Sequence, residues 1–200
     1  MGISWKNFAR KFEKELELDS LDSIQALVTP ALNKRKSNIQ EEYGNLSIDQ
    51  FESESDFESY RDCMADDYAE AQSVADTLNE MIVTALYKLI ELKRKSLFKR
   101  YVNDVNERRL AYIDYVVSQC PYDMSSLSEN RKIEELRLIN NCIKHNDSAV
   151  SQELVDSNPA YTIGEKLSIS SADIDNYKMA ARLYICDMAV KFHQIDDQDA

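Results

Sequence analysis

Apolar residues recur every three to four positions along most of the chain, which is the spacing of one face of an α-helix. The clearest run covers residues 56–102, where no glycine or proline interrupts the pattern. Its stripe consists of Val74, Leu78, Met81, Ile82, Ala85, Leu86, Leu89 and Leu92. The pattern predicts one very long helix, or two helices joined by a tight polar junction near Asn103 and Asp104.

Weaker periodic patterns predict further helices on both sides of this run. Their ranges are 4–18, 21–43 with an interruption at Pro30, 105–119, 128–146 and 172–194. In the first of them, one side carries the apolar residues Trp5, Phe8, Phe12 and Leu16. Residues 148–171 lack such a pattern, so we expect loops and short turns there.

The composition supports a helical fold. The 200 residues include only three glycines and three prolines, where usual frequencies would give about 14 and 10. Turn-rich sheet folds and glycine-rich phosphate loops are therefore disfavoured. We predict an all-α bundle of about five to seven helices. Residues 1–50 would form an N-terminal helical extension, residues 51–195 the bundle, and residues 196–200 an acidic tail.

The charge is strongly negative overall but unevenly distributed. A formal net charge of −12 argues against a general nucleic-acid coat. Residues 88–109 nevertheless carry eight basic and three acidic residues, whereas residues 49–70 carry nine acidic residues and Arg61 alone as a base. These windows are either solvated helix faces or a surface that docks RNA or a protein partner. The acidic window also allows an inhibitor or DNA mimic.

The cysteines and the first residues bear on the compartment. Cys63, Cys120, Cys142 and Cys186 are widely separated, without a CxxC pair or a histidine at metal-ligand spacing. We expect reduced cysteines, a cytoplasmic protein, and no metal or cofactor. The first residues lack the apolar run of a secretory signal, and no run approaches 18 apolar residues, so no membrane partner is expected.

The segment 134–146 holds the candidate chemistry. At 100° per residue, Arg137, Asn141 and His145 form one polar stripe of a helix. Asn140 instead occupies the apolar line of this helix. A buried asparagine costs about 1–3 kcal/mol unless it is hydrogen-bonded, and on an apolar stripe it often fixes register or oligomeric state.

This segment resembles the HEPN superfamily, helical bundles marked by an arginine followed after four to six residues by a histidine. In the frame Asn140-Asn141-Cys142-Ile143-Lys144-His145, His145 matches the motif histidine and Asn141 the polar residue after the arginine. Asn140 stands where the family has arginine, and Arg137 lies one turn earlier. The resemblance covers roughly residues 55–195.

The resemblance implies metal-independent RNA cleavage or RNA binding, in a toxin or antiphage-defence setting. His145 would be the general acid or base, Arg137 the phosphate clamp and Asn141 an orienting group. Lys144 and Asn140 would contact RNA. Family sites are completed across a two-fold axis, so a homodimer and an antitoxin or other protein partner are expected.

Two other interpretations stay open. His145 can be a structural partner of the helix dipole, as we also expect for His193. The chain can also be a non-catalytic module that dimerises through the helix containing residues 140–145.

Overall fold

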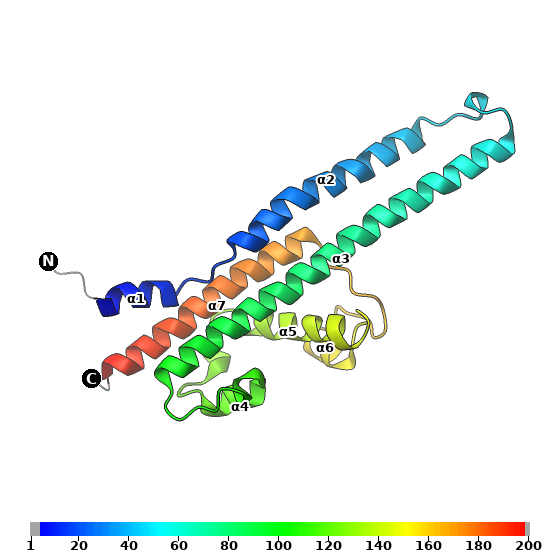
Figure 1. The fold of residues 1–200 in the computed structure, drawn as a ribbon. Helices are drawn as coiled ribbons and strands as arrows, with labels where there is room; N and C mark the ends of the chain where they lie inside the picture. The colour runs from blue at the N-terminus through cyan, green and yellow to red at the C-terminus, as the bar shows by residue number, and fades with distance from the viewer. Residues whose placement is uncertain (1–4, 199–200) are drawn as a thin grey trace. The chain divides into compact units, whose positions relative to one another are not determined.

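The computed structural model describes residues 5–198, and this part of the chain is helical. Its seven α-helices are α1 (Trp5–Glu13), α2 (Asp19–Gly44), α3 (Glu54–Tyr101), α4 (Ile113–Gln119), α5 (Asn130–His145), α6 (Gln152–Ser157) and α7 (Ser171–Gln198) (Figure 1). Short 3-10 helices occur at η1 (Ile48–Gln50), η2 (Arg109–Ala111) and η3 (Met124–Ser126). The prediction of an all-α bundle with five to seven helices is confirmed.

The chain divides into two compact units. Within the described range, residues 5–18 and 82–198 form the first unit, and residues 19–81 form the second. This division differs from a boundary near residue 50. The reason is that α1 packs against α7, whereas α2 pairs with the first part of α3.

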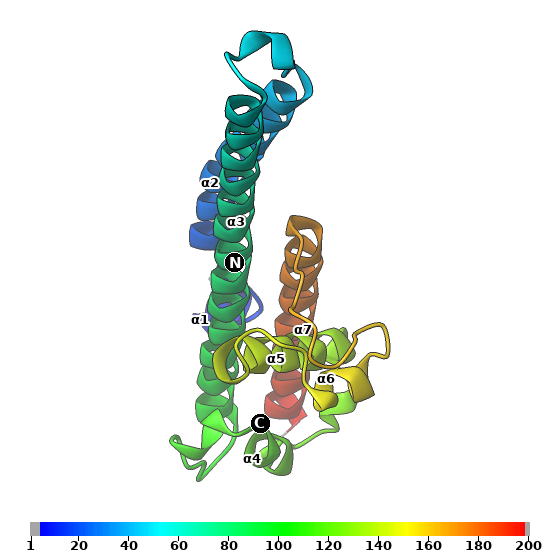
Figure 2. The ribbon, with the colours of Figure 1, turned by 90° about the vertical axis from the view of Figure 1, so that its right-hand side faces the viewer.

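The first unit is built around the second part of α3 together with α5 and α7. Figure 2 shows α5 lying across α3 and α7. The ring of Phe192 contacts Phe98 edge-on at 5.3 Å between centroids and stacks on Tyr101 at 5.5 Å. Fully buried apolar side chains from the three helices include Leu86, Ile90, Leu97, Leu136, Ile139, Ile185 and Met188. This core holds α5 in place.

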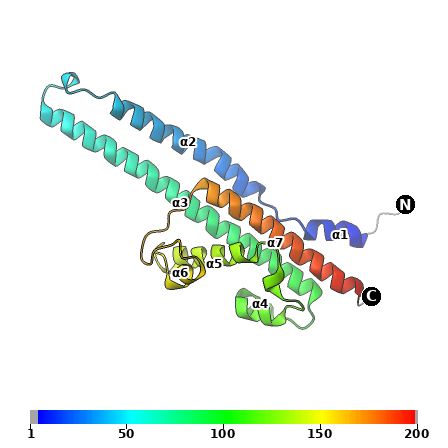
Figure 3. The same ribbon diagram turned by 180° about the vertical axis from the view of Figure 1, so that it is seen from behind.

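The second unit is a helical hairpin of α2 and residues 54–81 of α3, which run antiparallel (Figure 3). Polar contacts join the two helices along their length. Arg35 pairs with Glu70 at 2.8 Å, and Tyr60 donates to Glu42 at 2.5 Å. The helix α2 runs through Pro30 without the predicted interruption, although proline removes one backbone hydrogen bond.

Local backbone chemistry explains the remaining differences from the predicted elements. The run at 56–102 is one uninterrupted helix, α3. The segment 105–119 starts its α-helix late, because the Asn106 side chain accepts hydrogen bonds from the N–H groups of Arg108 and Arg109 and holds a turn there. Within the expected loop, α6 forms because the Ser151 hydroxyl caps its first turn.

Candidate functional site

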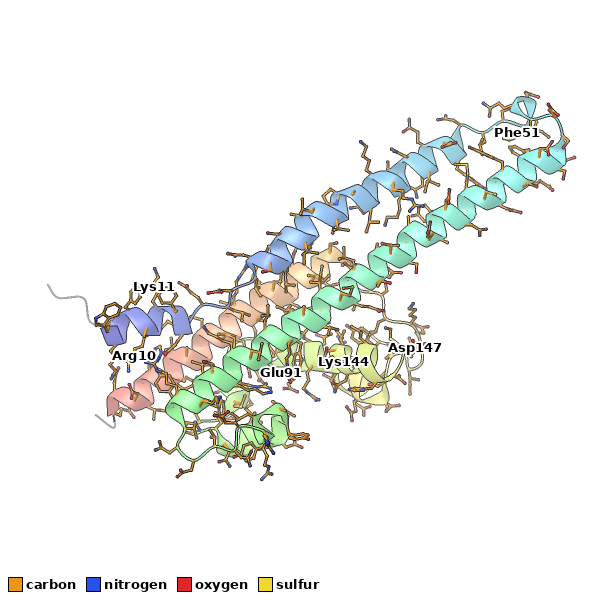
Figure 4. The ribbon with its side chains drawn as sticks, in the orientation of Figure 1. Arg10, Lys11, Phe51, Glu91, Lys144 and Asp147 are labelled. Atoms are coloured by element: carbon orange, nitrogen blue, oxygen red, sulfur yellow. The ribbon has the colours of Figure 1, made fainter. Side chains whose placement is uncertain are left out.

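The helix α5 is buried along most of its length. The buried side chains are Ile133, Leu136, Leu138, Ile139, Asn140 and Cys142. At its C-terminal end, however, Lys144 and His145 are exposed. Figure 4 labels Lys144 and Asp147 at this end. The sequence-predicted candidate residues therefore separate into a buried group and an exposed tip.

The backbone after α5 holds this tip in a defined conformation. The N–H groups of Asn146 and Ser148 both donate to the carbonyl of Cys142, at 3.0 and 3.1 Å. The Asn146 side-chain amide donates to the Ala149 carbonyl at 2.7 Å. Asp147 and Ser148 have φ values of 50° and 59°. Such left-handed conformations are costly for residues other than glycine and tend to be retained at functional sites.

A second loop is bonded to the first. The Leu167 N–H donates to the Ser148 carbonyl at 2.8 Å, and the Val150 N–H donates to the Glu165 carbonyl at 2.8 Å. An isolated antiparallel bridge joins Ala149 and Lys166, whose side chain is exposed. We define residues 144–149 and 164–167 as the α5 tip. It carries the exposed basic residues Lys144, His145 and Lys166 and the exposed acidic residues Asp147 and Glu165.

Arg137 is not brought to this tip. Its Nε donates to Glu134 at 2.8 Å, and the side chain is mostly buried. Arg137 and His145 are eight positions apart on the α-helix, which corresponds to about 12 Å along the axis. Within one protomer, the predicted phosphate clamp and the predicted acid or base therefore do not converge on one phosphodiester.

Asn140 lies in the core, with 2 % of its surface exposed. It therefore cannot contact RNA in this conformation, nor can it form the centre of a dimer interface. Its Oδ1 has no hydrogen-bond partner. Asn141, one position later, is partly exposed and stays on the polar side of α5.

The basic segment 88–109 is largely engaged within the first unit. Lys99 pairs with Glu107 at 2.7 Å, and Lys93 donates to the Phe12 carbonyl at 2.6 Å. The other engaged members are Lys88 with Glu91, Arg100 with Glu13, and Arg94, which is buried. Much of the charge of this segment is therefore paired or buried, while Arg108 and Arg109 remain exposed.

A polar cluster that the sequence did not indicate joins α1, α3 and α7. His193 Nε2 lies 2.7 Å from Glu13 Oε2, and the Tyr101 hydroxyl donates to the same oxygen at 2.6 Å. Arg100 Nη1 lies 2.6 Å from the other Glu13 oxygen. Burial raises the pKa of Glu13, but the bonds from Tyr101 and His193 outweigh it and lower the pKa below its usual value. Glu13 is therefore a partly buried carboxylate.

His193 is buried rather than exposed at a helix end, so the expectation of a simple dipole role does not hold. Burial lowers the pKa of His193, and the neighbouring Glu13 offsets only part of that effect. A groove of about 390 Å³ passes this ring. It is lined by Asn7, Arg10, Lys11, Lys14, Val190, His193, Gln194 and Asp197. Sequence spacing gave no signal for a pair 180 residues apart.

Arg94 is a second feature that the sequence concealed, because it lies inside a basic run but is 1 % exposed. Its guanidinium bonds to the hydroxyls of Tyr87 and Tyr184, and its Nε and Nη2 have no partner. Burial raises the pKa of Tyr184 to about 12. A buried cation of this kind is costly, and no groove described here reaches it.

Residues 5–198 contain no group of three or more histidine, cysteine or acidic side chains arranged to hold a metal ion. Across that same range, no helix combines the length and apolar character needed to cross a bilayer. Comparison with known proteins finds no matching family model, no matching curated protein and no matching solved structure.

Proposed function

We propose that the chain is a HEPN-like helical protein that binds RNA through the α5 tip and does not cleave it. The observation that carries the proposal is the exposure of Lys144 and His145 at the end of an otherwise buried helix. The bonded loops place the backbone of the exposed Lys166 beside Ala149, four residues after His145. A lysine contacts a phosphate as a point charge, and a histidine adds a hydrogen bond and a stacking surface.

Cleavage is not expected because His145 lacks a partner for the reaction. Metal-independent cleavage needs a group that moves a proton and a cation that holds the phosphate. Arg137 is occupied by Glu134 and lies about 12 Å away along the helix. Asn140, at the family's arginine position, is neutral and buried. The tip therefore supports recognition rather than catalysis.

The proposal is tested with a fluorescent single-stranded RNA of 20 mixed nucleotides, followed by anisotropy and by gel electrophoresis of the RNA. The wild-type chain should bind the RNA and leave its length unchanged. The double variant Lys144→Gln, His145→Gln should bind at least fivefold more weakly, because it loses a phosphate contact and an imidazole. Lys132→Gln is the matched control, since Lys132 is exposed at the other end of α5.

Two results would overturn this proposal. Equal affinity of the double variant and the wild type would remove the α5 tip from RNA binding. RNA shortening that His145→Ala abolishes would show a nuclease, and the proposed absence of catalysis would be wrong.

A second candidate function, self-association, is favoured by the small core of the hairpin. Of residues 19–81, only Leu21, Met64 and Ala71 are buried. An apolar groove of about 300 Å³ lies between Ile39, Tyr43, Met64 and Tyr68. Two paired helices about 40 Å long offer roughly 800 Å² to a partner, which is the size of a stable interface.

The occupant that fits this face is a second copy of the chain. In an antiparallel pair of hairpins, Lys34 of one copy would approach the acidic residues 54–70 of the other, whereas Arg35 and Lys36 are bonded to Glu70 and Gln72 of their own hairpin. The result would be a four-helix bundle, in which each hairpin supplies the apolar layer that the other lacks.

A further inference from the structure

The short helix α1 is packed against the first unit with its aromatic side outward. Trp5, Phe8 and Phe12 are 79 %, 47 % and 48 % exposed. Their rings contact one another edge-on, at 5.7 Å and 5.0 Å between centroids. The sequence predicted that these three residues and Leu16 lie on one side of a helix. Of the four, only Leu16 is buried, after the helix has ended at Glu13.

Charged side chains attach the opposite side of α1 to α7. Figure 4 labels one of them, Arg10. Arg10 lies 2.6 Å from Asp196 and 2.8 Å from Asp197, and Lys6 pairs with the same two carboxylates. At 100° per residue, Arg10 lies roughly 140–160° around the helix from the three aromatic rings. The attachment of α1 to α7 therefore leaves its aromatic stripe exposed.

The charge beside the stripe selects its partner. Lys11 lies about 60° from Phe8 around the helix, and Lys14 follows the helix. Both are exposed, and neither has a side-chain ion pair within residues 5–198. The acid of α1, Glu13, faces the core. The outward side of α1 thus combines aromatic rings with Lys11. The segment after the helix adds Lys14 and two exposed acids, Glu15 and Glu17.

A second copy of the chain fits this face poorly. Aromatic side chains bury about 150–250 Å² each, so the exposed parts of the three rings amount to roughly 400 Å². That is about half of the roughly 800 Å² per partner found in stable interfaces. Pairing two copies of α1 would also bring like charges from Lys11 and Lys14 together.

We propose that the aromatic face of α1 docks on an anionic lipid surface. A short helix with tryptophan and phenylalanine on one side and basic residues around it lies in the plane of the membrane interface, with its rings among the acyl chains. Each lysine near an anionic surface strengthens binding by about fivefold. This proposal revises the expectation of no membrane partner, and it needs no helix that spans the bilayer.

The single tryptophan of the chain, Trp5, provides the readout. The full chain is titrated with vesicles of phosphatidylcholine alone and with vesicles containing half phosphatidylglycerol. With the anionic vesicles, the emission of Trp5 should shift to shorter wavelength and the protein should sediment with them. Binding should weaken at least tenfold without the anionic lipid or in 0.5 M salt.

Two variants separate the contributions. Phe8→Ser with Phe12→Ser should reduce vesicle binding at least tenfold while Trp5 remains as the reporter. Lys11→Gln with Lys14→Gln should remove the preference for anionic lipid. Leu183→Ser is the matched control, because Leu183 is a half-exposed apolar residue of α7 and should not matter.

Other outcomes would overturn the proposal. Absence of both the emission shift and sedimentation with anionic vesicles would show that the face docks on something other than lipid. A dimer in solution that the Phe8→Ser, Phe12→Ser variant converts to a monomer would show an interface between copies instead.

Discussion

Asn140 shows how one residue can look functional in the sequence and act differently in the fold. Its place on the apolar line of α5 suggested a register or dimer device. In the structure it is a core residue whose Oδ1 has no hydrogen-bond partner. Burial therefore removes it from any surface, and its unsatisfied oxygen is a cost to stability.

We predict that Asn140→Leu leaves the free energy of unfolding unchanged or raises it by up to about 1 kcal/mol, because an unsatisfied polar atom is replaced by an apolar group of similar size. The mass in solution should not change. Urea unfolding and light scattering measure the two quantities. A loss of more than about 2 kcal/mol, or a new oligomeric state, would show that Asn140 has a partner that the single chain lacks.

The difference between local sequence pattern and tertiary packing explains what the sequence could predict of the site. The limits of α5 and the exposed position of His145 follow from periodicity and from the polar residues that end the helix. The pairing of Arg137 with Glu134 is also local, three residues apart. By contrast, Arg94 belongs to a run of exposed basic residues, and only the packing of Tyr184 from α7 buries it.

At the scale of elements, α1 is held by groups that protons can disturb. Its Glu13 contacts His193. Burial lowers the pKa of His193, and Glu13 raises it only in part. The charges of Arg10 and Lys14 lower this pKa further. The pKa of Glu13 itself is lowered by Tyr101, His193 and Arg100, despite burial. No periodicity could reveal this contact, because its two ends lie in the first and last helices of the described chain.

We predict that acid destabilises the first unit in two stages. Because the folded pKa of His193 lies below 6.5, its contribution is full above pH 6.5 and is lost as pH falls through its folded pKa. The stabilising contribution of Glu13 is full above pH 4.5 and is lost as pH falls through its folded pKa, because that pKa is also lowered. The melting temperature should therefore fall between pH 7.5 and 5.5.

The control for this prediction is His193→Gln, which cannot titrate. Circular dichroism at both pH values measures the melting temperatures of the variant and the wild type. The variant should lose most of the dependence between pH 7.5 and 5.5. A wild-type melting temperature that rises on acidification would contradict the direction derived for His193.

Considered as a whole molecule, the chain is expected to self-associate through the hairpin. Ile39→Glu with Tyr68→Glu places charges in the apolar groove of the hairpin and should convert a dimer to a monomer, because buried like charges disrupt an interface. Leu183→Glu, on α7, is the control and should leave the mass unchanged. Light scattering measures each mass, and a monomeric wild type at high micromolar concentration would contradict the four-helix arrangement.

Amide hydrogen exchange with and without the 20-nucleotide RNA measures whether RNA contacts the α5 tip. We expect slower exchange in residues 144–149 and 164–167 when RNA is bound, with little change in the basic segment 88–109. Protection confined to 88–109, or no protection at the tip under conditions where RNA binds, would contradict it.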